Sequence, residues 1–183
     1  MKRLSVLLLL LLIFFLGVYS SLTTRPNAEV LNEFHRMMPR FRAHIAKTGV
    51  AVLIDYDQPL IRRRLWAIEL KTGAVLLNAH VSHSMKSGLL IPRDFSNDPK
   101  SYKSCRGAFV TGKAYQGRHG YSLQLNGLEK DVNDNASKRA IIFQGQYRPW
   151  SLGSFITVPL VNQKLIDLAQ GGVFVWVHGS EPK

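Results

Sequence analysis

The sequence predicts a mainly β domain, on the evidence of three patterns. Short runs rich in Val, Ile, Leu and aromatic residues follow one another from Val50 almost to the end of the chain. Turn-forming residues separate these runs, as at 71–73, 117–120 and 133–135. Helical periodicity is confined to one segment before the first run and one close to the C-terminus. Short strands at this density are typical of a β-sandwich or a barrel.

The segment before the strands, residues 27–49, is expected to form an amphipathic helix. Its apolar residues recur at three- and four-residue steps and make one stripe, which consists of Val30, Leu31, Phe34, Met38, Phe41 and Ile45. Asn27 can cap the start of this helix, and Gly49 is suited to its end. Pro39 should kink or split it, because proline removes a helical hydrogen bond.

The strands are expected at the apolar runs themselves, which are residues 50–56, 63–70, 74–81, 107–115, 121–128, 139–145 and 172–179. A short helix over 161–172, ended by Gly171, should interrupt the last two. Residues 84–104 hold few apolar side chains and many turn formers, so we expect a loop that crosses one face and could close over a site.

Residues 1–22 have the layout of a secretory signal: a basic start, an apolar run from Leu4 to Val18, and small residues after it. The run is shorter than the roughly 20 residues that a spanning helix needs. Tyr19 lies among the small residues, so a retained signal anchor is the alternative to a cleaved signal peptide. The expected organisation is therefore a leader over 1–22, a linker and helix over 23–49, and the β domain over 50–183.

The chain carries a formal charge of +12, of which about +10 remains without Lys2 and Arg3. Such an excess favours polyanionic surroundings, namely nucleic acid, anionic lipid or acidic polymers of the cell envelope. Since the leader predicts export, no nucleic acid partner is expected. The predicted location is the periplasm or cell envelope, with an anchor in the inner membrane as the variant if the leader is retained.

Cysteine and histidine usage predicts no metal and no cofactor. Cys105 is the single cysteine, which excludes an internal disulfide, and flanking Lys103 and Arg106 are expected to lower its pKa. His80 and His83 would point to opposite faces of a strand and could not share a metal. His119 lies between glycines, where it either fixes a turn or serves as a substrate contact or substitute base.

The stretch RPWSLGSFITVP, residues 148–159, resembles a loop that carries a nucleophile. Gly153 would let backbone N–H groups approach a substrate as an oxyanion hole, with Ser154 at the reactive position. A serine hydroxyl needs an adjacent base to react. The preceding strand ends at Gln144, and an amide cannot accept a proton at useful pH.

Several motifs together make the chain resemble the murein L,D-transpeptidase catalytic-domain family. They are LWAIELKTGAVLLNAHVSH, FSNDPKSYKS, GKAYQGRHGYSLQLNGLE, NDNASKRAIIFQG and KLIDLAQGG. Asp94 stands where the family's second motif begins with a small residue. The resemblance implies an L,D-transpeptidase-like β-sandwich with an open cleft. It also implies a place in the bacterial cell envelope and the stem peptides of peptidoglycan as substrate.

The same resemblance places the family's active-site positions on this chain. The family's histidine base falls on Gln144, followed by Gly145, and its Ser-x-Gly-Cys motif falls on Ser151, Gly153 and Ser154. Phe155 replaces the family's next proline, and the loop between Gly145 and Ser151 is shorter than in the family. The substrate-binding positions implied by the resemblance are Gly145, Ser151, Gly153, His119 and Tyr115.

Three functional hypotheses follow. The favoured one is an exported, catalytically inactive relative that binds stem peptides or regulates an active envelope enzyme. The alternative is an active murein transpeptidase or carboxypeptidase-type acyl transferase that uses Ser154 or Cys105 with a non-standard base. The third is a basic envelope protein that binds anionic lipid or nucleic acid and only reuses the fold.

Overall fold

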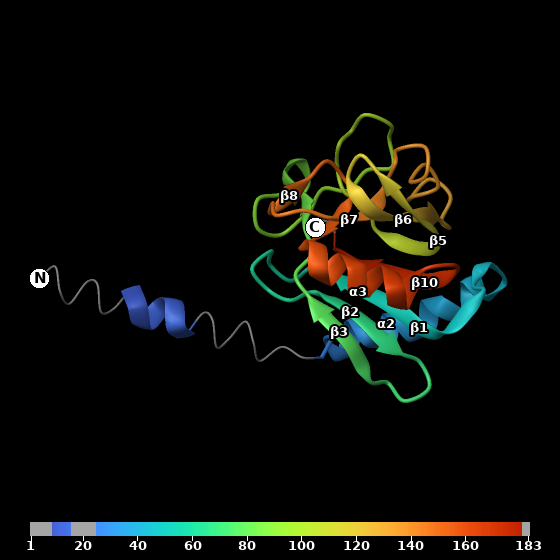
Figure 1. The fold of residues 1–183 in the computed structure, drawn as a ribbon, viewed down its shortest axis with the longest axis horizontal. Helices are drawn as coiled ribbons and strands as arrows, with labels where there is room; N and C mark the ends of the chain where they lie inside the picture. Colours follow the sequence, from blue (N-terminus) through green and yellow to red (C-terminus); the bar gives the residue numbers. More distant parts are fainter. Residues whose placement is uncertain (1–8, 16–24, 181–183) are drawn as a thin grey trace, which may run out of the picture.

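The computed structural model describes residues 9–15 and 25–180, and it confirms the mainly β prediction (Figure 1). Eight strands form one sheet in the order β3-β2-β1-β10-β5-β6-β7-β9, and β4 pairs with β8 in a second, two-stranded sheet. The bounds are β1 Lys47–Asp55, β2 Leu65–Glu69, β3 Val75–Ala79, β4 His83–Ser84, β5 Gly107–Gly117, β6 Gly120–Gly127, β7 Ile142–Gly145, β8 Trp150–Ser151, β9 Phe155–Thr157 and β10 Val173–His178.

Each predicted strand overlaps an observed one, whereas the short strands β4, β8 and β9 were not predicted. Residues 88–106 form the predicted loop, after one 3₁₀ turn, η2, at Met85–Ser87. The late helix is α3, Pro159–Ala169, and the positive φ of Gly171 turns the chain away after it.

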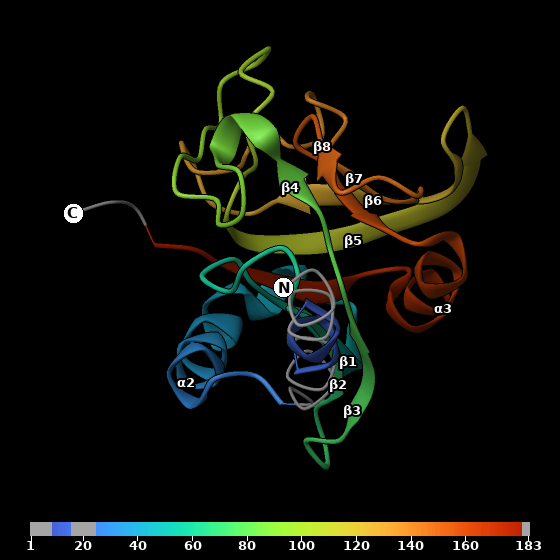
Figure 2. The same cartoon turned by 90° about the vertical axis from the view of Figure 1, so that its left-hand side faces the viewer.

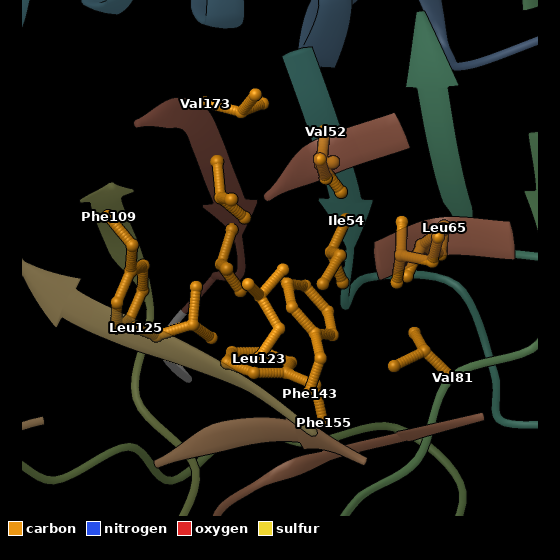
Figure 3. Close-up of a cluster of buried hydrophobic side chains, with 14 of the residues drawn as sticks. Val52, Ile54, Leu65, Val81, Phe109, Leu123, Leu125, Phe143, Phe155 and Val173 are labelled. Carbon is orange, nitrogen blue, oxygen red and sulfur yellow. The ribbon is translucent and has the colours of Figure 1, made fainter. Parts of the chain in front are cut away.

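The large sheet bends so that its two ends face each other across the core, which gives the sandwich. In Figure 2, strands β5, β6 and β7 lie above β1, β2 and β3. Figure 3 shows side chains from both layers meeting between them. Val52, Ile54 and Leu65 come from one layer, and Leu123, Leu125, Phe143 and Phe155 come from the other. Helix α3 closes one end of this core with Leu165 and Ile166, which are fully buried.

The N-terminal helix begins as predicted and ends earlier. The Asn27 side chain accepts a hydrogen bond from Glu29 N at the start of α2, Ala28–Met37. At Pro39 the helix gives way to a 3₁₀ segment, η1, Met38–His44. The prediction that Gly49 ends the helix is wrong, because β1 already includes it. The N–H groups of residues 46 and 47 donate to the Gly172 carbonyl, which commits the chain to the sheet from that point.

Helix α2 lies on the outer side of the sheet, where it covers a second apolar cluster. Val30 and Phe34 pack there with Phe174 and the two buried tryptophans, Trp66 and Trp176. The leader prediction falls mostly outside the described residues. Residues 9–15 are helical, and no helix among the described residues combines the length and apolar character needed to cross a membrane.

Candidate functional site

Strand register shows which side chains share a face of the sheet with Gln144, the predicted base position. Gln144 lies opposite Ser122 on one side and Ile156 on the other, and Tyr115 lies opposite Ser122. Directly opposed residues share a face, so these four side chains form one cross-strand row. Ser154 lies just before β9, in the bend that follows Gly153, so strand alternation does not place its side chain in this row.

The Ser154 hydroxyl is held by the backbone of the neighbouring strand. Its Oγ donates to the Ala140 carbonyl at 3.3 Å and accepts from Ile142 N at 3.4 Å. Within the described chain, which includes all six histidines, no imidazole forms a hydrogen bond with Ser154. Both hydrogen-bond partners of the hydroxyl are backbone groups, and neither of them is a base.

Gln144, at the base position, is sealed from solvent. Its side chain is 4% exposed, and its Oε1 has no hydrogen-bond partner in the described structure. An amide neither accepts nor delivers a proton at neutral pH, and burial keeps a substrate from it. The cavity nearest to this row, of about 370 Å³, lies over Ile156 and is lined by residues 80–82 and 146–149 among others.

The loop between Gln144 and Ser154 includes β8, which pairs with β4. Trp150 pairs with His83 across the two-stranded sheet, and its indole N–H donates to the Leu89 carbonyl at 3.0 Å. Ser151 and Gly153 are buried, and the Gly153 N–H donates to Ser151 Oγ at 3.1 Å. This N–H is one of the groups expected to stabilise an oxyanion, and here it is used within the loop.

Gly153 is required where it stands. Its φ is +115°, a conformation that residues with a side chain rarely adopt. A Cβ there would come within 2.9 Å of the Lys103 carbonyl oxygen and 2.8 Å of Ile141 Cδ1. The loop is thus packed closely against the 95–105 segment at this glycine.

Cys105 is buried, and its thiol contacts an arginine and a backbone carbonyl. Its Sγ lies 2.7 Å from Arg139 Nη1 and 3.5 Å from the Ser96 carbonyl oxygen. Burial raises the pKa of the thiol, and the Arg139 guanidinium only partly opposes this. The expectation that Lys103 and Arg106 lower the pKa is therefore wrong, because desolvation dominates and a different arginine contacts the sulfur.

His119 and Gly145 meet at a second cavity, of about 490 Å³, beside α3. His119 occupies the tight turn between β5 and β6, where Nε2 accepts from Arg118 Nε at 2.9 Å and Nδ1 lies 3.2 Å from the Gln146 amide nitrogen. Desolvation lowers the pKa of His119, and Arg118 and Arg148 lower it further. Tyr115 does not join them, because it belongs to the row of Gln144 on the opposite face.

His83, the other histidine near the loop, is fully buried between Arg64 and the Gly88 carbonyl. Desolvation and the Arg64 charge lower the pKa of His83 to about 4, so the ring is neutral at physiological pH. The described residues contain no group of three or more His, Cys, Asp or Glu side chains arranged to hold a metal ion.

A family model for the L,D-transpeptidase catalytic domain matches residues 23–149. The chain belongs to this family. The matched segment includes Gln144 and Gly145 but stops before Ser151, so the loop that carries Ser154 lies beyond it. The L,D-transpeptidase match thus covers most of the scaffold, while Gln144 as the base position and Ser154 as the nucleophile position stay predictions from the sequence.

Solved structures with the L,D-transpeptidase fold are similar to the chain at low identity. The helical cell shape determining protein Pgp2 from Campylobacter jejuni has a TM-score of 0.52 and 13% identity over 75% of this chain and 49% of its own. Bd1075 from Bdellovibrio bacteriovorus has a TM-score of 0.50 and 13% identity, and the match covers 74% of this chain and 49% of Bd1075. An L,D-transpeptidase from Stackebrandtia nassauensis has a TM-score of 0.46 and 18% identity over 75% and 59%.

The chain spans about half the length of the first two of these proteins, and the likeness shows the fold. No curated protein matches the chain.

Sequence reasoning missed the role of Arg139 in this L,D-transpeptidase domain. Besides Cys105, its guanidinium contacts the Lys103 carbonyl oxygen at 2.5 Å and Ser101 Oγ at 3.2 Å, and it donates to the Ser96 carbonyl. Arg139 thereby fixes the 95–105 loop beside Gly153. Its position in a motif shared with the family was the available signal, but nothing in the local sequence distinguishes it from a surface arginine.

Proposed function

We propose that the protein is an exported, catalytically inactive L,D-transpeptidase relative that binds peptidoglycan stem peptides or regulates an active envelope enzyme. The observation that carries this proposal is the environment of Ser154. Its hydroxyl bonds to strand backbone, and the row beside it presents the Gln144 amide. General base catalysis supplies about 10²- to 10⁴-fold in rate, and an unassisted hydroxyl forgoes it.

Binding without turnover is supported by the cavity beside α3. It is lined by His119, Gly145, several polar side chains and, on α3, the carboxylate of Asp167, and Arg118 and Arg148 act electrostatically on His119 at the edge away from α3. A stem peptide carries carboxylates, which guanidinium groups bind well. We assign the recognition of a stem-peptide carboxylate to this edge.

Export and envelope location are supported by the signal-like leader, the charge of +12 and membership of the L,D-transpeptidase family. The leader places the protein either free in the periplasm or attached to the inner membrane through its N-terminus. Either location brings the cavity within reach of peptidoglycan.

Catalytic silence is tested by incubating the full chain with tetrapeptide-bearing muropeptides and measuring intact mass and cross-linked product. We expect no acyl adduct and no product. A mass increase equal to an acylated stem, located on Ser154 and absent from Ser154→Ala, would contradict the proposal and establish the acyl-transferase alternative.

Binding is tested by sedimentation with purified, lipid-free sacculi. We expect the wild-type chain to pellet, and the Arg118→Gln/His119→Ala variant to pellet at least fivefold less, because one charge-assisted contact contributes about 1.5–3 kcal/mol. Lys71→Gln/Lys130→Gln removes two exposed cations elsewhere and serves as the matched control. Equal loss in both variants would show general charge attraction instead of a site.

A further inference from the structure

Exposed apolar side chains gather where three loops meet at one side of the molecule. We call them the apolar face: Ile61, Leu89, Leu90, Tyr147 and Trp150. Tyr147 is 81% exposed, the first three are 52–62% exposed, and Trp150 is half-buried. Isolated exposed apolar residues are common, but a contiguous group calls for an occupant.

Contacts between the three loops establish that the face is continuous. Leu60 N donates to the Leu90 carbonyl at 2.8 Å, and the Trp150 indole donates to the Leu89 carbonyl at 3.0 Å. Leu60 and Tyr147 line the same cavity. Figures 1 and 2 agree with this arrangement, since the loop after β1, strand β4 and strand β8 lie on the side that Figure 2 turns toward the viewer.

The loops that carry the apolar face are positively charged. Segments 58–63, 85–90 and 146–152 contain no Asp or Glu, and they present exposed Arg63, Lys86 and Arg148. Lys86 Nζ lies 4.8 Å from the ring centre of Tyr102, which is itself exposed. Asp57, the nearest acid in sequence to the first segment, is engaged by Arg93 and His178. Apolar side chains within a positively charged rim are the pattern of an interfacial membrane-binding surface.

The N-terminal part of the chain favours a membrane as the occupant of the apolar face. Arg25 and Pro26 line a cavity with Pro59 and Arg62, so the chain enters the domain beside the first of the three loops. Residues 9–15 form a helix whose apolar side chains are each 45–65% exposed. Ten residue steps separate Phe15 from Arg25, which can span at most about 35 Å. If this helix lies in a bilayer, Arg25, which lies beside the first of the three loops, is held within about that distance of it.

We propose that the apolar face docks the folded domain on an anionic membrane surface, with Tyr147 and Trp150 at the depth of the headgroups and the surrounding cations near the phosphates. The inference rests on the envelope location in the proposed function, and it adds a second membrane contact beyond the N-terminus. It does not depend on stem-peptide binding, which uses the cavity beside α3.

Trp150 provides the test. Trp66 and Trp176 are buried, so quenching of tryptophan fluorescence by lipids brominated along the acyl chain reports mainly on Trp150, with Trp150→Phe as the baseline. The full chain is reconstituted into vesicles of phosphatidylcholine with or without 30% phosphatidylglycerol, a composition chosen for the assay, so that attachment through the leader is common to all samples.

We expect strong quenching on anionic vesicles, little on zwitterionic ones, and reversal by salt. Leu89→Ser/Leu90→Ser should remove most of the quenching, while Leu76→Ser/Leu160→Ser, which changes two exposed leucines elsewhere, should leave it unchanged. Arg63→Gln and Lys86→Gln should each weaken docking about fivefold, because a cation near an anionic surface contributes about that factor.

Three results would overturn the proposal. The first is wild-type quenching no greater than that of Trp150→Phe, and the second is equal quenching on zwitterionic vesicles. The third is protection of Trp150 from acrylamide by lipid-free sacculi but not by vesicles, which would assign the face to peptidoglycan. Sacculus sedimentation of Arg118→Gln/His119→Ala is measured separately, so failure of docking and failure of stem-peptide binding give different results.

Discussion

Replacing Ser154 by alanine separates a structural serine from a catalytic one. The hydroxyl makes two hydrogen bonds, of 3.3 and 3.4 Å, both to the backbone around the start of β7. Such long neutral bonds contribute at the low end of the usual 0.5–1.5 kcal/mol each. Ser154 is half-buried, so water can replace the lost partner of Ile142 N. We expect Ser154→Ala to lower the free energy of unfolding by about 1 kcal/mol.

The matched comparison is Thr111→Val, which removes a hydroxyl from a fully enclosed site. Thr111 Oγ1 donates to the Ala169 carbonyl at 2.6 Å and accepts from the N–H groups of Gly172 and Val173. The substitution removes this partner from the Ala169 carbonyl and the Val173 N–H, while the Gly172 N–H keeps its bond to the Thr111 carbonyl. We expect a cost of about 2 kcal/mol or more.

Urea unfolding followed by tryptophan fluorescence measures both changes, and a muropeptide incubation is run on the same samples. About 1 kcal/mol corresponds to a midpoint shift of about 2–4 °C in a thermal scan of a protein of this size. Turnover by the wild type that disappears in Ser154→Ala, with stability unchanged, would refute the structural role argued for this hydroxyl.

Three further predictions follow from the same region. Gly145→Ala places a Cβ 2.8 Å from Pro159 Cα, so α3 must shift; urea unfolding should show a loss of about 1–3 kcal/mol. The pKa of His83 falls from an ordinary 6.5 to about 4 on folding, so between these pH values the unfolded chain binds a proton that the folded chain does not. Thermal scans should therefore show the free energy of unfolding fall by roughly 2 kcal/mol from pH 6.5 to pH 4. His83→Gln should reduce this dependence on pH. The variant Gln144→His/Ser154→Cys should yield no more cross-linked muropeptide than wild type, because residue 144 is buried; product would contradict the closed-site interpretation.

The strands were predictable because their apolar runs are long and their turns carry Gly, Asn or Asp. The two-residue strands β4 and β8 were not predictable, because they form only through the pairing of His83 with Trp150, and these two residues lie far apart in the sequence. The end of the N-terminal helix was missed for a similar reason. The Gly172 carbonyl accepts hydrogen bonds from residues 46 and 47, so the chain has joined the sheet before Gly49 is reached.

Site chemistry was predictable only where it depends on residue type. The amide at position 144 already argues against base catalysis, wherever its side chain lies. The pKa of Cys105 was predicted in the wrong direction, because neighbours in sequence were taken as its environment, whereas burial and Arg139 provide it. The separation of His119 from Tyr115 follows from strand alternation, and it could be predicted only once the register of β5 and β6 was known.

The connection between β7 and β9 constrains the site separately from the residue types at positions 144 and 154. These strands are parallel, so the chain must return along the full length of β7 before Phe155 can pair with Phe143. Parallel neighbours usually require a dozen or more residues for this return, and here residues 146–154 accomplish it. So short a connection cannot form a wide loop. It runs back as β8, fastened to β4, and turns through Gly153 against the 95–105 segment. The short connection therefore fixes where Ser154 lies relative to β7, through the bonds of its hydroxyl to the backbone of residues 140 and 142.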